Sequence, residues 1–475
     1  MTVSEETPLL HNDHSHISEG TSKRELIYER FSPRQKRVLV AIVSWCGLMP
    51  LFVSATIYPS IPAMVKDFNT TPQIIGLAVS ISILAMSMGA LAAASYSTFY
   101  GRRPIYLFAL PLLVFGSVGV SLSRTVGELY VFRFLQAAGA SPGFSIGAGV
   151  IGDIYKLEER GSAMGVFLAA ILLGPSLAPV AGGLAAEYAS WRHMQFIIGV
   201  FGLIAFGIIW TCFPETSHPG VRGIDKLCRQ AENGVKIRWN RYIVNPLSPL
   251  GLLRAPNILA VTIACFTVAL TFFVLMVPIA YTIGTKYNIR NDALIGACAI
   301  PGGLGEIIGA PLSGRLSDRI VVKWRRSRGG VWYPEDRLRA ATSGLLYFLP
   351  LSMLLSGLII NYVGGPLGLA LVFVCLFANG FGLELVLSPA AAYVVDVLHS
   401  RSAEAVAANN GFRSVILSVA IAGIMPMIDA YGVVATNTAS AVLTWFGFGL
   451  LWLTIRYGES MRAWCNIGFS TAETN

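Results

Sequence analysis

The sequence predicts an all-α integral membrane protein with 12 transmembrane helices. Of its 475 residues, 54% are hydrophobic and only 13% are charged, and the mean hydropathy is +0.62. A water-soluble domain of this size could not cover so much apolar surface with polar side chains. Because a backbone in lipid must satisfy its own hydrogen bonds, apolar runs of about 20 residues are expected to be helices.

Twelve apolar runs follow one another along the chain, and a polar stretch from Glu215 to Arg254 divides them into two sets of six. The first set comprises Val38–Tyr58, the 34 uncharged residues between Asp67 and Arg102, Pro104–Ser123, Leu129–Gly152, Gly161–Ala186 and His193–Pro214. The second set comprises Ala255–Thr285, Ala293–Gly314, Ala340–Ile360, Leu367–Val395, Ala405–Ile428 and Ala430–Ile455.

These runs divide the chain into five segments. We expect a disordered cytoplasmic tail at 1–37, six-helix bundles at 38–214 and 258–456, a cytoplasmic central loop at 215–257 and a cytoplasmic tail at 457–475. The first tail has no apolar core before a cleavage site, so we expect no signal peptide.

The basic residues predict the orientation of the chain in the membrane. With both termini in the cytoplasm, 28 of the 35 Lys and Arg lie in cytoplasmic segments and five on the other side. Such a bias is the usual sign of the cytoplasmic face. The net charge of +9 therefore reflects topology and attraction to lipid headgroups, and we expect no nucleic-acid partner.

Short signals in the polar segments bear on location. Glu5 followed by Leu9 and Leu10 fits an acidic dileucine sorting pattern, which would direct the protein to a vacuolar or endosomal membrane. We expect the protein in the plasma membrane, with the vacuolar or endosomal membrane as the alternative. Asn69 begins an Asn-x-Thr sequon on the outer side, although it lies close to the second run for a glycosylation site.

The sequence has no catalytic or metal-binding pattern in a context that supports its function. The stretch "GFSIG" at 143–147 matches a nucleophile elbow, but it lies inside an apolar helix rather than at a strand-to-helix turn. The chain has no Walker A loop and no H-E-x-x-H sequence, and its seven cysteines follow no metal spacing. We expect neither an enzyme nor a cofactor or metal, and a monomer whose partners are the lipid bilayer, protons and a small-molecule substrate.

Basic turns recur at matching places in the two sets of runs. "GRRP", with Gly101, Arg102 and Arg103, follows the second run, and "GRLSDR", from Gly314 to Arg319, follows the eighth. A repeat of six spans with equivalent loops is typical of transporters in which one half rocks against the other around a midplane site. Over residues 38–456 the chain resembles the major facilitator superfamily, which implies two pseudo-symmetric six-helix bundles.

The resemblance assigns these turns to a cytoplasmic gate. The family loop carries an Asp that helps to hold the inner gate closed, and here Thr98 stands in its place. The second half keeps the beginning of the motif, with Gly314, Asp318 and Arg319. Thr98 cannot carry the charge, so we expect Asp318 to contribute more of the clamp, and Asp153 at the end of the fourth span to assist the gate.

A Gly- and Pro-rich fifth span, "LLGPSLAPVAGG", resembles the antiporter motif of the superfamily's exporters. Its characteristic residues are Gly174, Pro175, Pro179, Gly182 and Gly183. "WRHMQF", "PET" and "SAEAVAANNGFRS" are similar to the fungal twelve-span drug:proton antiporters of the quinidine-resistance branch. That branch implies export of drugs, polyamines or organic acids.

Ionisable residues inside spans are costly and mark ion or substrate paths. Arg133 matches the fourth-span Arg that the family associates with proton coupling. Glu384 is the best candidate for a proton-carrying carboxyl, because a carboxyl removed from water favours its neutral form, and Glu306 is the second candidate. Arg413, preceded by Asn409 and Asn410, is expected to pair with Glu384 or to face substrate.

The charges inside the spans also indicate the cargo. The first half has no mid-membrane acid, whereas an exporter of organic cations would benefit from one. We therefore expect a proton-coupled efflux antiporter for a small organic compound, such as an organic acid, secondary metabolite or drug. A proton-driven importer or facilitator is the alternative, and a non-transporting receptor is a weaker one because no sizeable soluble segment is present.

Overall fold

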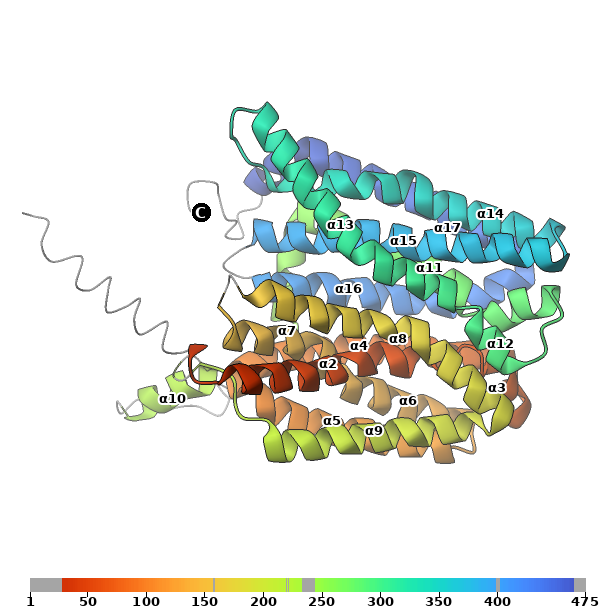
Figure 1. The fold of residues 1–475 in the computed structure, drawn as a ribbon, viewed down its shortest axis with the longest axis horizontal. Coiled ribbons are helices and arrows are strands. Elements are labelled where there is room, and N and C mark those ends of the chain that lie inside the picture. Colours follow the sequence, from red (N-terminus) through yellow and green to blue (C-terminus); the bar gives the residue numbers. More distant parts are fainter. Residues whose placement is uncertain are drawn as a thin grey trace, which may run out of the picture.

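The computed structural model describes residues 28–156, 159–218, 220, 222–232, 244–398 and 402–464. Every regular element in these ranges is a helix. The helices run roughly parallel to one long direction, and the first and second halves of the chain lie beside each other (Figure 1). The all-helical membrane architecture expected from composition is confirmed.

Among the described residues, the first half contains eight α-helices, which begin a few residues before the first apolar run and end just before the polar stretch. They are α2 (Pro33–Ala55), α3 (Ile61–Asp67), α4 (Pro72–Tyr100), α5 (Arg102–Leu122), α6 (Val126–Ala140), α7 (Pro142–Ile154), α8 (Arg160–Tyr188) and α9 (Trp191–Cys212).

The polar stretch and the second half contain α-helices and short 3₁₀ (η2, η4) and π (η3, η5) segments. The polar stretch holds α10 (Gly223–Glu232) and η2 (Ser248–Arg254). The second half consists of α11 (Pro256–Met276), η3 (Ala280–Gly284), α12 (Asp292–Ala297), α13 (Ile300–Ser327), η4 (Pro334–Ala341), η5 (Gly344–Phe348), α14 (Leu349–Tyr362), α15 (Gly365–Val397), α16 (Ser402–Ala422) and α17 (Ile424–Trp464).

Eleven helices or helix groups of the described chain are long and apolar enough to cross a membrane. The remaining expected span, Leu129–Gly152, is divided between α6 and α7. Pro142 is the first residue of α7, where its missing N–H interrupts the hydrogen-bond ladder. The fourth crossing therefore consists of two consecutive helices, α6 and α7. With it, the described chain has the expected 12 crossings.

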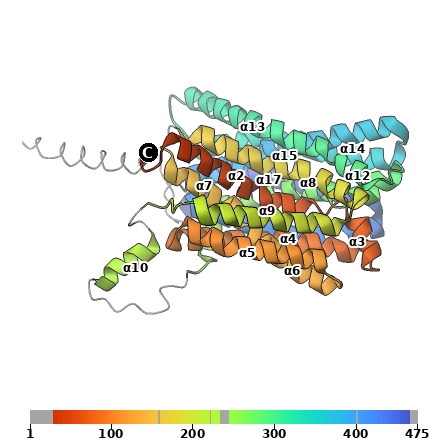
Figure 2. The same cartoon turned by 60° about the horizontal axis from the view of Figure 1, so that its bottom comes forward.

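The bundle has two chemically different ends. We call the end that holds Arg102, Arg319 and α10 the basic end, and the end that holds α3 and α12 the opposite end (Figure 1). Figure 2 shows α10 standing apart from the bundle beyond the basic end. Arg222, just before this helix, donates to Asp225 in its first turn at 2.8 Å, and this hydrogen bond holds the pKa of Asp225 below its ordinary value.

Two apolar cores occupy the bundle. One consists only of residues from the first half, between Leu39 and Phe213. The other fills the second half and also takes in first-half residues near the opposite end, including Ile61, Ile75 and Trp191. The two halves therefore share a continuous apolar core at the opposite end.

The outer helices extend beyond the boundaries expected from sequence. The helix expected from residue 38 begins at Pro33, because Ser32 and Gln35 form a reciprocal capping box. The tail expected from residue 457 is helical to Trp464, where Arg462 forms an ion pair with Glu335. Helix boundaries thus follow caps and tertiary contacts rather than the end of the apolar run.

Glycines allow α13 and α15 to touch along their backbones. A Cβ atom on Gly305 would stand 2.7 Å from the backbone nitrogen of Phe381, and one on Gly380 would stand 3.2 Å from that of Glu306. In lipid, such close backbone packing replaces the hydrophobic effect as the force that joins helices. This contact fixes how two functional candidates, described below, face each other.

We predict that Gly305→Ala destabilises the protein by about 1–3 kcal/mol, because the added methyl group overpacks the α13–α15 contact. Gly314→Ala is the matched control on the same helix, since a Cβ atom there meets nothing within 4 Å and Ala is the better helix former. Thermal unfolding in detergent measures both, and equal melting temperatures for the two variants would contradict the packing argument.

Candidate functional site

Two buried carboxyl groups, Glu306 of α13 and Glu384 of α15, lie next to each other. The residues are only 4% and 9% exposed, and a Cβ atom on Gly309 would stand 3.1 Å from Cβ of Glu384. Their charges interact. Neither makes a hydrogen bond or ion pair with a described residue, so both remain able to exchange a proton or to bind another molecule.

Arg413 of α16 completes this group. It interacts electrostatically with Glu384 and with Cys265 of α11, and its Nε is buried without a hydrogen-bond partner. Asn409, one turn earlier, accepts a hydrogen bond of 2.8 Å from Thr262, so its oxygen already has a structural partner. Asn410 is half-buried. The structure brings together Glu306, Glu384 and Arg413 but gives Asn409 a packing role.

In the first half, Arg133 of α6 is fully buried and belongs to a network of amides. Its Nη1 donates to the carbonyl of Val53 at 3.2 Å and to Gln136 at 2.8 Å. Gln136 in turn donates to Ser117 at 2.9 Å and to Gln195 at 3.0 Å. The Nε and Nη2 of Arg133 have no partner, so one edge of the guanidinium is free to accept a bidentate ligand.

Tyr58 connects the two charged groups across the halves. It lies just after α2, is 2% exposed, and interacts electrostatically with Arg133 of the first half and Glu306 of the second. Arg133, Tyr58, Glu306, Glu384 and Arg413 thus form a series of neighbouring ionisable groups, which we call the central series. Tyr58 was not predicted from the sequence, in which nothing distinguishes it from other tyrosines near span ends.

Gln136 and Gln195 were not predicted either, although Gln136 follows Arg133 by three residues and Gln195 lies in the stretch "WRHMQF". Two uncharged amides inside apolar spans were the available signal. Their hydrogen bonds hold Arg133 in place, so they position the guanidinium rather than add a charge of their own.

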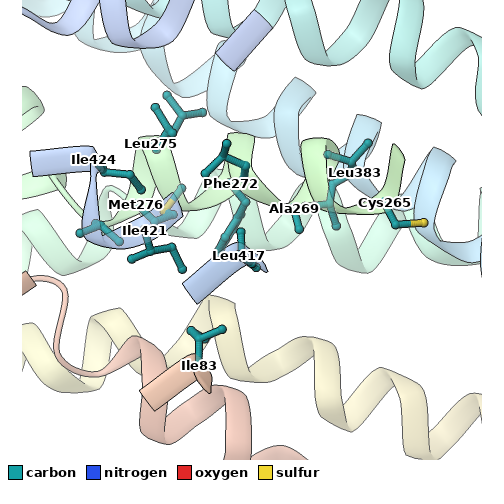
Figure 3. Close-up of a cluster of buried hydrophobic side chains, with 14 of the residues drawn as sticks. Ile83, Cys265, Ala269, Phe272, Leu275, Met276, Leu383, Leu417, Ile421 and Ile424 are labelled. Atoms are coloured by element: carbon teal, nitrogen blue, oxygen red, sulfur yellow. The ribbon is translucent and has the colours of Figure 1, made fainter. Parts of the chain in front are cut away.

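An apolar surface adjoins the central series. Figure 3 shows Phe272 and Met276 of α11 near Leu417 and Ile421 of α16, with Ile83 of α4 lying across from them in the first half. In the same cluster, Cys265 interacts electrostatically with Arg413. Leu383 directly precedes Glu384 in the sequence. A few charged groups and a large cluster of buried apolar side chains therefore lie side by side, which is the combination that ligand sites commonly use.

The Gly- and Pro-rich segment of α8 closes the opposite end. Gly182 packs against the backbone of Thr56 after α2, and Gly183 packs against the backbone of Asp292 of α12. The Asp292 N–H also donates to Glu187 at 2.8 Å. Earlier in α8, a Cβ atom on Gly174 would stand 3.0 Å from Cβ of Leu51 in α2. Pro175 and Pro179 lie inside the helix, and the segment joins the halves by backbone contact.

A second contact between the halves runs along α4 and α16. Ser87 donates to the carbonyl of Gly411 at 2.7 Å, Ser80 donates to that of Ser418, and Gln73 contacts Asp429 beyond the end of α16. On the other side of the molecule, α8 and α13 approach near α12 and diverge toward the basic end (Figure 1). The structure is a state closed at the opposite end.

At the basic end of the first half, Glu215 serves as the helix cap of α5. Its carboxylate accepts the backbone N–H groups of Arg102 at 2.9 Å and Arg103 at 3.2 Å, which satisfies donors at a helix N-terminus. Gly101 has φ 110°, and a Cβ atom there would stand 2.8 Å from the Glu215 carboxyl carbon. Only glycine fits this turn. Glu215 was not predicted as a site residue from the sequence, although it is the acidic residue of "PET".

The expected gate residues of this half divide into two groups. Arg102 forms an ion pair of 3.0 Å with Asp153 and donates to Ser97 at 2.9 Å, so these two candidates do meet. Thr98 is exposed and its hydroxyl donates only to the carbonyl of Ala94 in its own helix. Thr98 therefore makes no described contact with the other half in this state.

The basic end of the second half has its own ion pairs. Arg337 pairs with Asp318 at 3.0 Å and with Asp396 of α15. Asp336 pairs with Arg328 at 2.7 Å and Arg339 at 3.1 Å. The carboxylate of Asp318 is thus engaged within its own half. Its expected clamp across the halves remains a prediction for a state closed at the basic end, as does the role of Gly314 and Arg319.

The other candidates lie away from the central series. Asn69 is exposed at the turn between α3 and α4, with φ 47°. Glu5, Leu9 and Leu10 lie outside the described residues. Within the described ranges, no group of three or more His, Cys, Asp or Glu could hold a metal ion.

The sequence matches known proteins over most of its length. A family model described as Major Facilitator Superfamily matches residues 43–421. The efflux pump radE of Floropilus chiversii is 27% identical over 454 residues, which are 92% of this chain and 82% of that protein. The MFS antiporter QDR3 of Candida albicans is 23% identical over 522 residues, covering 84% of this chain and 74% of that protein.

The fold also matches solved structures. A bacterial homologue of the human lysosomal transporter Spinster, in an inward-facing and unoccupied conformation, superposes with a TM-score of 0.66 at 13% identity. The match covers 91% of this chain and 99% of that chain. At this level of identity the likeness concerns the fold alone.

We predict that Glu215→Ala destabilises the protein by about 1–3 kcal/mol, because it leaves two backbone donors of α5 without an acceptor. Thr98→Val, at the nearby exposed position, is the control and should change stability by about 0.5 kcal/mol or less. Unfolding of both variants in detergent gives the comparison. A Thr98 variant as unstable as the Glu215 variant would rule out the cap as the stabilising feature.

Proposed function

The chain belongs to the major facilitator superfamily, and we propose that it is a proton-coupled efflux antiporter that exports a small amphiphilic organic compound by alternating access. The observation that carries the proposal is the central series, in which Tyr58 lies between Arg133 of the first half and the unpaired carboxyls of the second. Its position between two halves that touch at the opposite end and along α4 and α16, and that diverge at the basic ends of α8 and α13 (Figure 1), suits a site that opens alternately to either side. The named relatives, an efflux pump and an antiporter, support the direction.

The proton is assigned to the pair Glu306 and Glu384. Two neighbouring buried carboxyls repel each other when both are ionised, so the pair tends to hold one proton. Arg413 interacts electrostatically with Glu384. Movement of Arg413 or arrival of a ligand would therefore change how readily the pair binds its proton.

Exchange of a proton for cargo requires that the proton weaken the binding of the cargo. A hydroxyl group of the cargo that donates to the Glu384 carboxylate meets this condition, because the protonated carboxyl is a poorer acceptor. The apolar surface around Phe272 and Leu417 supplies the contact for the remainder of such a molecule. A neutral, hydroxyl-bearing secondary metabolite or drug is the cargo that fits antiport best.

An anionic cargo would couple in the other direction. A carboxylate bound to Arg413, or to the free edge of Arg133, would bind more tightly when Glu384 is protonated, because two negative charges no longer meet. Proton and organic acid would then move together. This is the proton-driven importer, and the unpaired guanidinium nitrogens are the observation that favours it.

The membrane and orientation are part of the proposal. We assign the basic end to the cytoplasm of a plasma-membrane protein, because 28 of its 35 Lys and Arg belong to that side. The present structure is then the inward-facing state. A vacuolar or endosomal membrane is the alternative that the segment around Leu9 and Leu10 would favour. We expect the monomer to be sufficient for transport.

The first test uses purified protein in liposomes with an imposed pH gradient and labelled neutral amphiphiles, organic acids and amines. We predict that the wild type accumulates a neutral hydroxylated amphiphile against its gradient. Glu384→Gln should abolish this accumulation and keep exchange down the cargo gradient. The reason is that Gln preserves the contact surface but cannot take up or release a proton.

The control is Glu459→Gln, which removes an exposed carboxyl of α17 and should transport as the wild type does. Full gradient-driven accumulation by the Glu384 variant would remove the proton assignment. Movement by the wild type only down the cargo's own gradient would identify a facilitator instead.

The charge of the cargo is tested with an organic acid and the alcohol of the same carbon skeleton. We predict that Arg413→Gln reduces uptake of the acid about tenfold more than that of the alcohol, because only the acid loses a charge-assisted hydrogen bond. Equal effects on both compounds would remove Arg413 from cargo recognition. Wild-type uptake of the acid together with protons would favour the importer.

A further inference from the structure

A cleft of about 360 Å³ opens on the surface of the second half, between α13, the segment around η5, and α15. Leu312, Leu316 and Phe348 at this cleft are 44%, 37% and 38% exposed. Exposed apolar residues within spans face lipid. The cleft lies apart from the central series, and its argument does not depend on the proposed transport activity.

The lining of the cleft changes from polar to apolar along the helix axes. Arg315, Arg319 and Ser343 line the part toward the basic end, because α13 runs toward that end and η5 runs away from it. Leu312, Phe348 and Phe381 line the part nearer the middle of the bundle, and Leu316 lies on α13 between the two arginines. This order matches a lipid molecule, with its headgroup at the membrane surface and its chains deeper.

The two arginines carry uncompensated charge. Neither Arg315 nor Arg319 forms a hydrogen bond or ion pair with a described residue. The acids nearby are already engaged, since Asp318 and Asp396 pair with Arg337. Two like charges four residues apart on one helix face repel each other. An anion between them would remove that repulsion, and guanidinium groups suit phosphate by shape and charge.

We propose that this cleft binds an anionic phospholipid of the leaflet at the basic end. Arg315 and Arg319 hold the headgroup phosphate, and an acyl chain lies along Leu312, Leu316 and Phe348. Basic pockets between helices are the form that anionic-lipid sites take in membrane proteins. The bound lipid steadies the contact of α13 with α15, because Phe381 lines the cleft and also packs on the glycines that set Glu306 beside Glu384.

The test is native mass spectrometry of the full chain in detergent, titrated with phosphatidylglycerol, phosphatidylcholine or glycerol phosphate. We expect phosphatidylglycerol to bind and to raise the melting temperature, with little effect of the other two probes. Arg315→Gln combined with Arg319→Gln should weaken phosphatidylglycerol binding about tenfold or more.

The control combines Lys323→Gln with Arg326→Gln, which removes the same charge from exposed positions of α13 outside the cleft and should leave binding within about twofold. Equal loss of binding in both double variants would reduce the effect to general surface charge and overturn the site. Stabilisation by glycerol phosphate equal to that by phosphatidylglycerol would identify a free-phosphate site and overturn the lipid assignment.

Discussion

Direct backbone contact at glycine is the constraint on which the arrangement of this protein depends. In lipid, helices gain little from burying apolar side chains, so they associate where their backbones can approach. Gly182 and Gly183 place α8 against α2 and α12, and this joins the two halves at the opposite end. Gly305 and Gly309 place α13 on α15, and this sets Glu306 beside Glu384. Closure and charge geometry therefore have the same physical origin.

The distribution of satisfied and unsatisfied charge separates structural groups from functional ones. At the basic end, carboxylates are matched within their own half, as Asp153 is by Arg102 and Asp336 is by two arginines. The central series has no such matching, although burial makes unpaired groups most costly there. Arg133 keeps one free edge, and the carboxyls of Glu306 and Glu384 form no hydrogen bond or ion pair with a described residue. Groups that stay unpaired despite this cost in free energy are the ones available to bind a proton or a ligand.

The divergence of α8 and α13 toward the basic end also bears on the gate candidates (Figure 1). Thr98 and Asp318 make their described contacts inside their own halves, because the basic ends of α8 and α13 have diverged in this state (Figure 1). A rocking motion about the glycine contacts of α8 would bring those ends together. The same motion would change the surroundings of Tyr58, which lies between Arg133 and Glu306, and so link the gate to the proton site.

The sequence alone determined the class of the protein, its 12 crossings and the candidates Arg133, Glu306, Glu384 and Arg413, because hydrophobic runs and isolated charges are local features. It did not reveal that the fourth crossing is divided into two helices at Pro142, that Glu215 caps α5, or that Tyr58 lies between Arg133 and Glu306. Those depend on residues distant along the chain, such as the 112 positions between Arg103 and Glu215. Only tertiary structure decided which charges meet, because helix rotation is set by where glycines let backbones touch rather than by hydropathy.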